Sequence, residues 1–218
     1  MNFVLKKELP LIGIILMPFV YLARIWNSLP EKVPMHWNYD GEIDRWGEKY
    51  TLIILVFFLT IFLYIILLFI PKIDPKKRLE IMGNKFYQLK VVLLLFFTCL
   101  AFIIIYFSQN QVIPNQSLLY MPAGILFIAL GNYFKVIQPN YFMGIRTPWT
   151  LENKEVWKAT HKLAGKIWML GGFIIIISCL IFPKEIAKYS LIAATIINVF
   201  VPIVFSYFKF KKIEKANF

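Results

Sequence analysis

Residues 52–70 read LIILVFFLTIFLYIILLFI and contain no charged side chain. At a rise of about 1.5 Å per residue, a helix of this length spans about 28 Å, which matches the hydrocarbon core of a bilayer. Further apolar runs of similar length, nearly free of charge, occur at Leu9–Leu29, Val91–Phe107, Leu118–Phe134, Ile167–Phe182 and Tyr189–Phe208. The sequence therefore predicts an all-α integral membrane protein with six transmembrane helices.

The composition of the whole chain excludes the main alternatives. Hydrophobic residues make up 59% and charged residues 17% of the 218 positions, against roughly 45–50% and about 25% in soluble globular proteins. The 21 Phe and 11 Tyr exclude a disordered chain, because they offer much apolar surface for burial. The two cysteines lie inside apolar runs and predict no disulfide.

The net charge of +12 is unevenly distributed along the chain, and this predicts an orientation. Eighteen of the 24 Lys and Arg lie in the N-terminal segment, the second and fourth connections and the C-terminal segment, against five in the other connections. The positive-inside rule then places both termini in the cytoplasm (N-in and C-in). The charge is thus mostly a topology signal with some attraction to anionic lipids, so we expect the lipid bilayer as partner and no direct nucleic acid binding.

The same pattern suggests a domain organisation. We expect an N-terminal two-span unit at 1–71 with an outer loop at 30–49, a basic cytoplasmic linker at 72–90, and a four-span domain at 91–218. No Asp, Glu or His lies within the six runs. Ion-coupled transporters usually carry ionisable groups at membrane depth, so this absence argues against a transporter.

The predicted outer loop is rich in turn-forming and aromatic residues. Pro30, Pro34 and the pair Asp40-Gly41 favour turns over a helix, and the surplus of acids over bases would attract a cationic ligand. His36, Asp40 and Asp44 are residue types that bind zinc, but we expect no metal site, since the prolines and glycines interrupt the helix that would align them. The candidate recognition residues of this loop are His36, Trp37, Asn38, Asp40, Gly41 and Asp44.

The predicted inner stretch 131–150 is apolar and aromatic although it lies outside the runs. This favours a segment that docks at the membrane interface rather than one that lies in water. Thr147 followed by Pro148 has the form of a helix N-cap with proline at the first helical position. The spacing of Val156, Thr160 and Leu163 predicts an interfacial amphipathic helix that leads into the fifth span. His161 lies on a neighbouring face, and no serine or cysteine nucleophile near it in sequence supports a catalytic role.

This inner stretch resembles the signature of the SdpI-type immunity proteins. The similar residues run from Gly131 to Leu151, then through Glu155-Val156-Trp157 and Thr160 to Gly165. The outer loop, with Pro34-Met35-His36-Trp37-Asn38 and Gly41, is similar to the small domain of unknown function that often precedes the SdpI module. The two patterns touch both halves of the chain, and the inner one is the more specific.

The resemblance implies a multi-pass protein of the bacterial cell membrane that protects its cell from a secreted antimicrobial peptide. In the founding system the protein is also a signal-transducing receptor that holds a cytoplasmic transcriptional repressor at the membrane. It implies no cofactor and no catalysis. The inner residues that could carry ligand response or signalling are Asn140, Gly144, Arg146, Thr147, Pro148, Trp149, Trp157, His161 and Gly165.

Two other classes of function stay open at this point. One is a membrane enzyme that acts on lipid or cell-wall precursors at the inner interface, and the other is an efflux transporter. For the immunity class, the sequence suggests that Arg146, Trp149, Trp157 and His161 form one interfacial cluster whose arrangement differs between free and engaged states.

Overall fold

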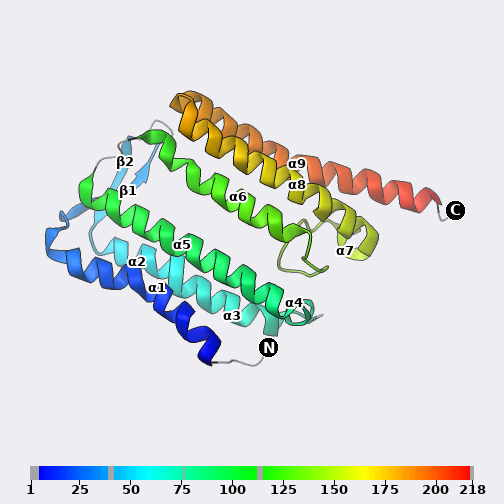
Figure 1. Cartoon of the computed structure of the whole chain (residues 1–218), viewed down its shortest axis with the longest axis horizontal. Helices are drawn as coiled ribbons and strands as arrows, with labels where there is room; N and C mark the ends of the chain where they lie inside the picture. Colours follow the sequence, from blue (N-terminus) through cyan, green and yellow to red (C-terminus); the bar gives the residue numbers. More distant parts are fainter. Residues whose placement is uncertain (1–4, 39–41, 76, 112–114, 217–218) are drawn as a thin grey trace. The chain divides into compact units, whose positions relative to one another are not determined.

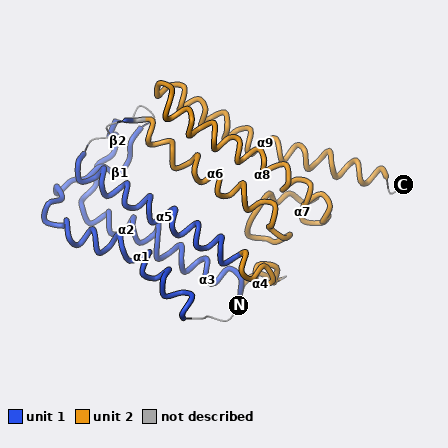
Figure 2. Tube along the Cα trace, in the orientation of Figure 1, with its two compact units in different colours: residues 1–72, 86–116 blue, residues 73–85, 117–218 orange. Residues whose placement is uncertain are grey.

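The computed structural model describes residues 5–38, 42–75, 77–111 and 115–216. The chain folds as two compact units, which Figure 2 distinguishes by colour. One unit comprises Met1–Lys72 with Phe86–Gln116, and the other comprises Ile73–Lys85 with Ser117–Phe218. The domain boundaries expected from the charge pattern stay a prediction.

The first unit holds three long helical stretches and a two-stranded sheet (Figure 1). Its elements are α1 (Leu5–Ile25) with a 3₁₀ turn η1 (Trp26–Ser28), β1 (Lys32–Trp37), β2 (Ile43–Glu48), α2 (Thr51–Phe57), a π-helical turn η2 (Phe58–Phe62), α3 (Leu63–Ile73) and α5 (Asn84–Asn110). An apolar core joins the sheet to the helices through Leu22, Leu29, Val33, Leu52, Val56, Ala101 and Ile105. The sheet is therefore fixed to one end of this unit's helices.

The strands β1 and β2 correct the prediction of an all-α protein. They pair antiparallel with Lys32 opposite Glu48 and Trp37 opposite Ile43, and the register shifts on both sides of His36. The side chain of Val33, in β1, is fully buried against the helices of this unit. A two-stranded hairpin is only marginally stable alone, and this one gains the support of the helices under it. The local sequence favours turns because proline is uncommon inside strands, and Pro34 lies in the middle of β1. The register shifts beside it also break the regular alternation of a strand.

The second unit contains α4 (Arg78–Met82), a 3₁₀ turn η3 (Gln116–Leu119), α6 (Met121–Phe134), α7 (Pro148–Glu152), α8 (Lys154–Ile181) and α9 (Lys184–Ala216). Helix α8 packs against both α6 and α9, as Figure 1 shows. One buried apolar cluster of this unit comprises Tyr120, Ile175, Cys179, Ala187 and Ala194. The connection between α6 and α7 is irregular and carries four of the nine residues of the predicted site, while the other five lie in α7 and α8.

Six helices in the described residues are long and apolar enough to cross a membrane, as the six runs predict. They span Leu5–Ser28, Thr51–Ile73, Asn84–Asn110, Ser117–Phe134, Lys154–Ile181 and Lys184–Ala216. Their outer faces expose large apolar side chains, among them Phe200 and Val204 of α9 at 60% and 51%. Large apolar patches of this kind are uncommon on soluble monomers and suit contact with lipid tails.

All six helices begin before their apolar runs, and three of these extensions contain polar residues that matter below. The first begins at Leu5 rather than Leu9, the third at Asn84 rather than Val91, and the fifth at Lys154 rather than Ile167. The extensions bring Glu8, Lys90 and His161 into the helices. The apolar runs themselves contain no Asp, Glu or His, as stated above, but the helices that include them do.

Candidate functional site

The connection from α6 to α7 is folded around the side chain of Asn140. This residue is 1% exposed. Its Oδ1 accepts hydrogen bonds from the backbone N–H of Phe142 and Met143, at 2.8 and 2.7 Å. Its Nδ2 donates to the carbonyls of Gln138 and Met143, at 2.8 and 3.2 Å. A buried amide must satisfy both its donors and its acceptor, and here the turn does so completely. Asn140 thus holds the shape of the segment.

His161 of α8 is hydrogen-bonded to the same segment, and the partners of its two ring nitrogens show which nitrogen carries the proton. Nε2 lies 3.0 Å from the backbone nitrogen of Ile145, which can only donate, so Nε2 accepts. Nδ1 lies 2.9 Å from the carbonyl oxygen of Trp157, which can only accept, so Nδ1 carries the proton. The ring is 1% exposed and neutral in this arrangement. Neither nitrogen is left free for acid–base chemistry.

Trp157 completes this buried support. Its indole ring stacks on the His161 ring with centroids 4.0 Å apart and planes 22° apart. Its Nε1 donates to the carbonyl of Ile137 at 2.8 Å. The edge of Phe134, the last residue of α6, meets the His161 ring at 5.7 Å. Both ends of the connection are therefore fastened to α8 by aromatic side chains.

Gly144 lies directly over the His161 ring. Its φ of +99° is a backbone conformation that residues with a side chain rarely adopt. A Cβ at this position would lie 2.4 Å from His161 Nε2. The backbone can therefore approach the ring closely enough for the Ile145 hydrogen bond only if residue 144 is glycine.

Thr147 and Pro148 begin α7 as the sequence predicts. The Thr147 side chain accepts from the backbone of Thr150, and the Thr150 side chain accepts from the backbone of Thr147, which together form a capping box. Thr150 is fully buried, and its hydroxyl also lies 2.8 Å from the carbonyl of Ile145. The cap therefore fixes the end of the segment that crosses His161.

Arg146 and Trp149 make their interactions away from the Trp157–His161 pair. The Arg146 guanidinium donates to the carbonyl of Tyr141 and is otherwise exposed. Trp149 Nε1 donates to Ser206 Oγ at 2.5 Å, and its ring meets Tyr207 edge-on at 5.5 Å. Trp149 thus ties α7 to α9. The suggestion that all four residues act as one cluster stays a prediction.

Gly165 is a packing residue between α6 and α8. A Cβ on Gly165 would lie 2.7 Å from the Gly131 carbonyl oxygen, and a Cβ on Gly172 would lie 2.5 Å from that of Gly124. The two pairs are seven residues, about two turns, apart on each helix. Small residues at such positions let helix backbones approach closely in a membrane.

We expect Gly165→Ala to lower the free energy of unfolding by about 1–3 kcal/mol, as overpacking at a rigid backbone contact does. The measurement is thermal unfolding in detergent micelles, followed by tryptophan fluorescence. Gly13→Ala in α1 is the matched control, since a Cβ there meets nothing within 4 Å. Equal melting temperatures for Gly165→Ala and the wild type would show that the helices are not held at this distance.

The predicted outer residues lie on the hairpin. His36 Nδ1 lies 2.6 Å from Asp44 Oδ1, and both side chains are about half exposed, at 57% and 44%. Asn38 bonds to Glu42 through the backbone and the side chain. Trp37 turns its ring toward Phe107 of α5 at 6.3 Å. Asp40 and Gly41 lie outside the described residues. His36 and Asp44 are therefore brought together, while Asp40, the third ligand considered for zinc, is untested.

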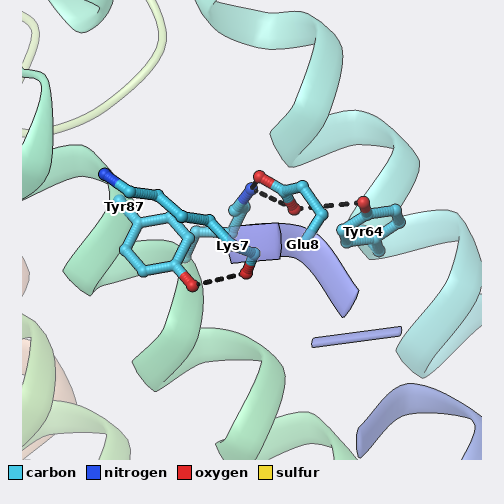
Figure 3. Close-up of polar contacts among 5 residues, drawn as sticks. Lys7, Glu8, Tyr64 and Tyr87 are labelled. Atoms are coloured by element: carbon cyan, nitrogen blue, oxygen red, sulfur yellow. Dashed lines mark hydrogen bonds and ion pairs between the residues drawn. The ribbon is translucent and has the colours of Figure 1, made fainter. Parts of the chain in front are cut away.

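One polar centre in the first unit is missed by the sequence reading. Lys90 of α5 is fully buried, and its Nζ lies 2.6 and 2.7 Å from the two carboxylate oxygens of Glu8 in α1, itself 3% exposed. The Tyr64 hydroxyl of α3 donates to Glu8 Oε2 at 3.1 Å. Figure 3 shows Tyr64 directed at the Glu8 carboxylate and the Tyr87 hydroxyl directed at the Lys7 carbonyl. The pair thus joins three helices through one charge-compensated centre.

A cavity of about 750 Å³ opens beside the connection between α6 and α7. It lies between the end of α6, the start of the connection and the first half of α8, with Arg78 of α4 at its margin. Trp157 and His161 form part of its wall.

Comparison with known proteins agrees with the resemblance read from the sequence. Residues 135–206 match the SdpI/YfhL protein family, and residues 13–70 match DUF1648, a domain of unknown function. The chain is 25% identical over 214 residues to Immunity protein SdpI of Bacillus subtilis (strain 168). The aligned region covers 98% of this chain and 100% of that protein. No solved structure matches the chain.

Together with the six candidate spans, these similarities identify a multi-pass membrane protein of bacteria. The SdpI/YfhL match begins at Lys135, at the start of the segment that Asn140 and His161 organise, and ends at Ser206, the partner of Trp149. The matched region therefore contains Asn140, Gly144, Trp157 and His161, although Phe134 and Gly131 lie just before it.

Proposed function

We propose that this protein, whose residues 135–206 form an SdpI/YfhL family region, protects its own cell from a secreted antimicrobial peptide. The observation that carries the proposal is the similarity to an immunity protein along essentially the whole length of both chains. The similarity covers both the hairpin and the inner segment, so both candidate regions belong to the part of the chain that is compared.

The proposal includes an orientation. With both termini in the cytoplasm, the hairpin faces outward and the segment 135–166 lies on the inner side. The bias of Lys and Arg toward that side supports this, and it persists when Lys90 is left out as a buried, paired residue. A peptide arriving from outside would then meet the hairpin first.

The hairpin suits a cationic or amphipathic peptide. The described residues of the outer loop carry four acids, Glu31, Glu42, Asp44 and Glu48, against three bases, Lys32, Arg45 and Lys49. Trp46 of β2 exposes 48% of its surface. Carboxylates attract a cationic peptide at low salt, and an exposed indole offers an apolar contact at the head-group level. We assign recognition to this surface.

Signalling to a cytoplasmic repressor is the finer part of the proposal. A ligand shifts a conformational equilibrium only if it binds the two states with different affinity. The backbone at Gly144 and Ile145, held by one hydrogen bond to His161, is the element that we propose changes its state. Release of that bond would alter the surface formed by residues 141–146, where a repressor could be held.

The function is tested by survival of a sensitive bacterium that expresses the protein and is challenged with peptide toxins of the founding type. We expect the intact protein to protect, and Arg146→Ala and His36→Ala to lose most of that protection at equal membrane levels. Both side chains are exposed, so their loss should leave folding intact. Lys215→Ala and, at the start of α9, Glu185→Ala, also exposed, are the controls for removal of a charge on each face outside the assigned surfaces.

Full protection by both variants would contradict the assigned site, and failure of the intact protein against every toxin would contradict the proposed function. Dependence of protection on the proton motive force would instead favour an efflux transporter, which the buried Glu8–Lys90 pair brings back into consideration. A membrane enzyme is less well supported, because both ring nitrogens of His161 are hydrogen-bonded to the backbone.

A further inference from the structure

The first half of α8 carries an unusual row of positive charge. Its lysines are spaced four residues apart, at 154, 158, 162 and 166. Residues four apart are neighbours on a helix, and like charges in that relation repel one another. The orientation of a membrane protein depends on how many Lys and Arg lie on each side of the membrane. It does not require these residues to lie on one face of a helix. The alignment therefore points to a common partner.

The row opens onto the cavity of about 750 Å³ beside the inner segment. Two further cations from other parts of the fold line the same space, so that its charged lining comprises Arg78, Lys135, Lys154, Lys158, Lys162 and Lys166. No Asp or Glu is among the lining residues. Among the described residues, none of the six forms an ion pair. The cavity thus concentrates positive charge that the described part of the chain leaves uncompensated.

The cavity lining also has an apolar part. It is built from Phe134, Ile137, Pro139, Trp157 and Met169. From Ile167 to Ile181 helix α8 has no charged residue, which corresponds to about 22 Å of helix. The cavity therefore lies at the end of a candidate span, a position that suits lipid head groups, and its lining combines cations with apolar side chains.

These features fit an anionic group attached to an apolar chain. Lys and Arg are the residues that bind phosphate, and basic pockets at the ends of transmembrane helices bind the head groups of anionic lipids. A free anion would need the cations but not the apolar wall.

We propose that this cavity binds the phosphate head group of an anionic phospholipid of the surrounding leaflet, with the acyl chains along Met169 and the apolar part of α8. The site is independent of the proposed immunity function. It would make the inner segment sensitive to lipid composition, because Trp157 and His161, which hold that segment, also line the cavity.

The experiment compares lipids on the purified full-length protein in detergent. Native mass spectrometry counts retained lipids, and thermal unfolding measures stabilisation, with phosphatidylglycerol, phosphatidylcholine, glycerol phosphate and inorganic phosphate as probes. We expect at least tenfold tighter retention of phosphatidylglycerol than of phosphatidylcholine, and weak effects of the two soluble phosphates. Equal stabilisation by inorganic phosphate would overturn the lipid assignment.

A matched pair of variants locates the site. Lys158→Gln/Lys162→Gln removes two cations of the cavity, and Lys212→Gln/Lys215→Gln removes two exposed cations of α9 outside it. We expect the first variant to lose at least tenfold in phosphatidylglycerol retention and the second less than twofold. Equal loss in both variants would show general surface attraction and would overturn the proposal.

The unliganded stability of the same variants provides an independent check on folding. Without anionic lipid, Lys158→Gln/Lys162→Gln should melt at or above the temperature of the wild type, because repulsion along α8 is relieved. With phosphatidylglycerol the order should reverse. Equal stabilisation of this variant and the wild type by the lipid would contradict the proposal, and so would preferential retention of an acidic peptide over the lipid.

Discussion

Replacement of Lys90 by methionine is expected to lower the free energy of unfolding by about 3–5 kcal/mol, the usual cost of leaving one partner of a buried ion pair uncompensated. Among the described residues, the change leaves the buried Glu8 carboxylate with the Tyr64 hydroxyl as its donor. Helix α5 then loses its ion pair with α1. The measurement is unfolding of the purified protein in mixed micelles, followed by circular dichroism.

Two further variants separate the ion pair from other effects of the substitution. Glu8→Leu/Lys90→Met removes both charges, and it should recover most of the loss, since well-packed apolar replacements of a buried pair are often neutral or stabilising. Lys49→Met breaks a pair with Glu31, whose side chain is 79% exposed, and it should cost less than about 1 kcal/mol. If Lys90→Met and Lys49→Met were equally stable, the buried pair would not hold the helices together.

The six spans could be predicted because bilayer thickness imposes a length on each apolar run. The Glu8–Lys90 pair could not, for the same reason. A charge at the end of an apolar run reads as the boundary of the span, and Lys90 reads as one more topogenic cation. What places these residues inside the fold is a contact across 82 positions of sequence. The sequence shows an acid, Glu8, just before the first apolar run and a cation, Lys90, just before the third. It does not show that the two side chains are in contact.

In the connection between α6 and α7, too, some features could be predicted from the sequence and others could not. Thr147 and Pro148 were predicted to begin a helix because an N-cap depends only on neighbouring residues. The position of His161 beneath Ile145 depends on a turn that Asn140 closes and on packing against α6. The residue types of the site were therefore readable in the sequence, whereas their roles required the fold. The hairpin was missed for a related reason, since its strands are stabilised by residues of α1, α2 and α5.

Gly144→Ala is expected to lower the free energy of unfolding by about 2–5 kcal/mol. Part of this is the cost of a side chain at φ of +99°, about 1–3 kcal/mol, and part is the overlap of the new Cβ with His161 Nε2. The ring must move, and the hydrogen bond from Ile145 is then lost. Protection against the peptide should fall as well, because this bond holds the surface that we assign to the response.

Gly83→Ala separates the two contributions to that cost. Gly83 also has a positive φ, of +50°, but the nearest atom to an added Cβ is the Ile81 carbonyl oxygen at 3.9 Å. It should therefore show backbone strain alone, without the steric term. In a second comparison, adding Gly144→Ala to a His161→Ala background should cost only about 1–3 kcal/mol, the strain that remains once the ring is gone. If Gly144→Ala cost as much without the ring as with it, His161 would not be the residue that requires glycine here, and the proposed link between the turn and α8 would fail with it.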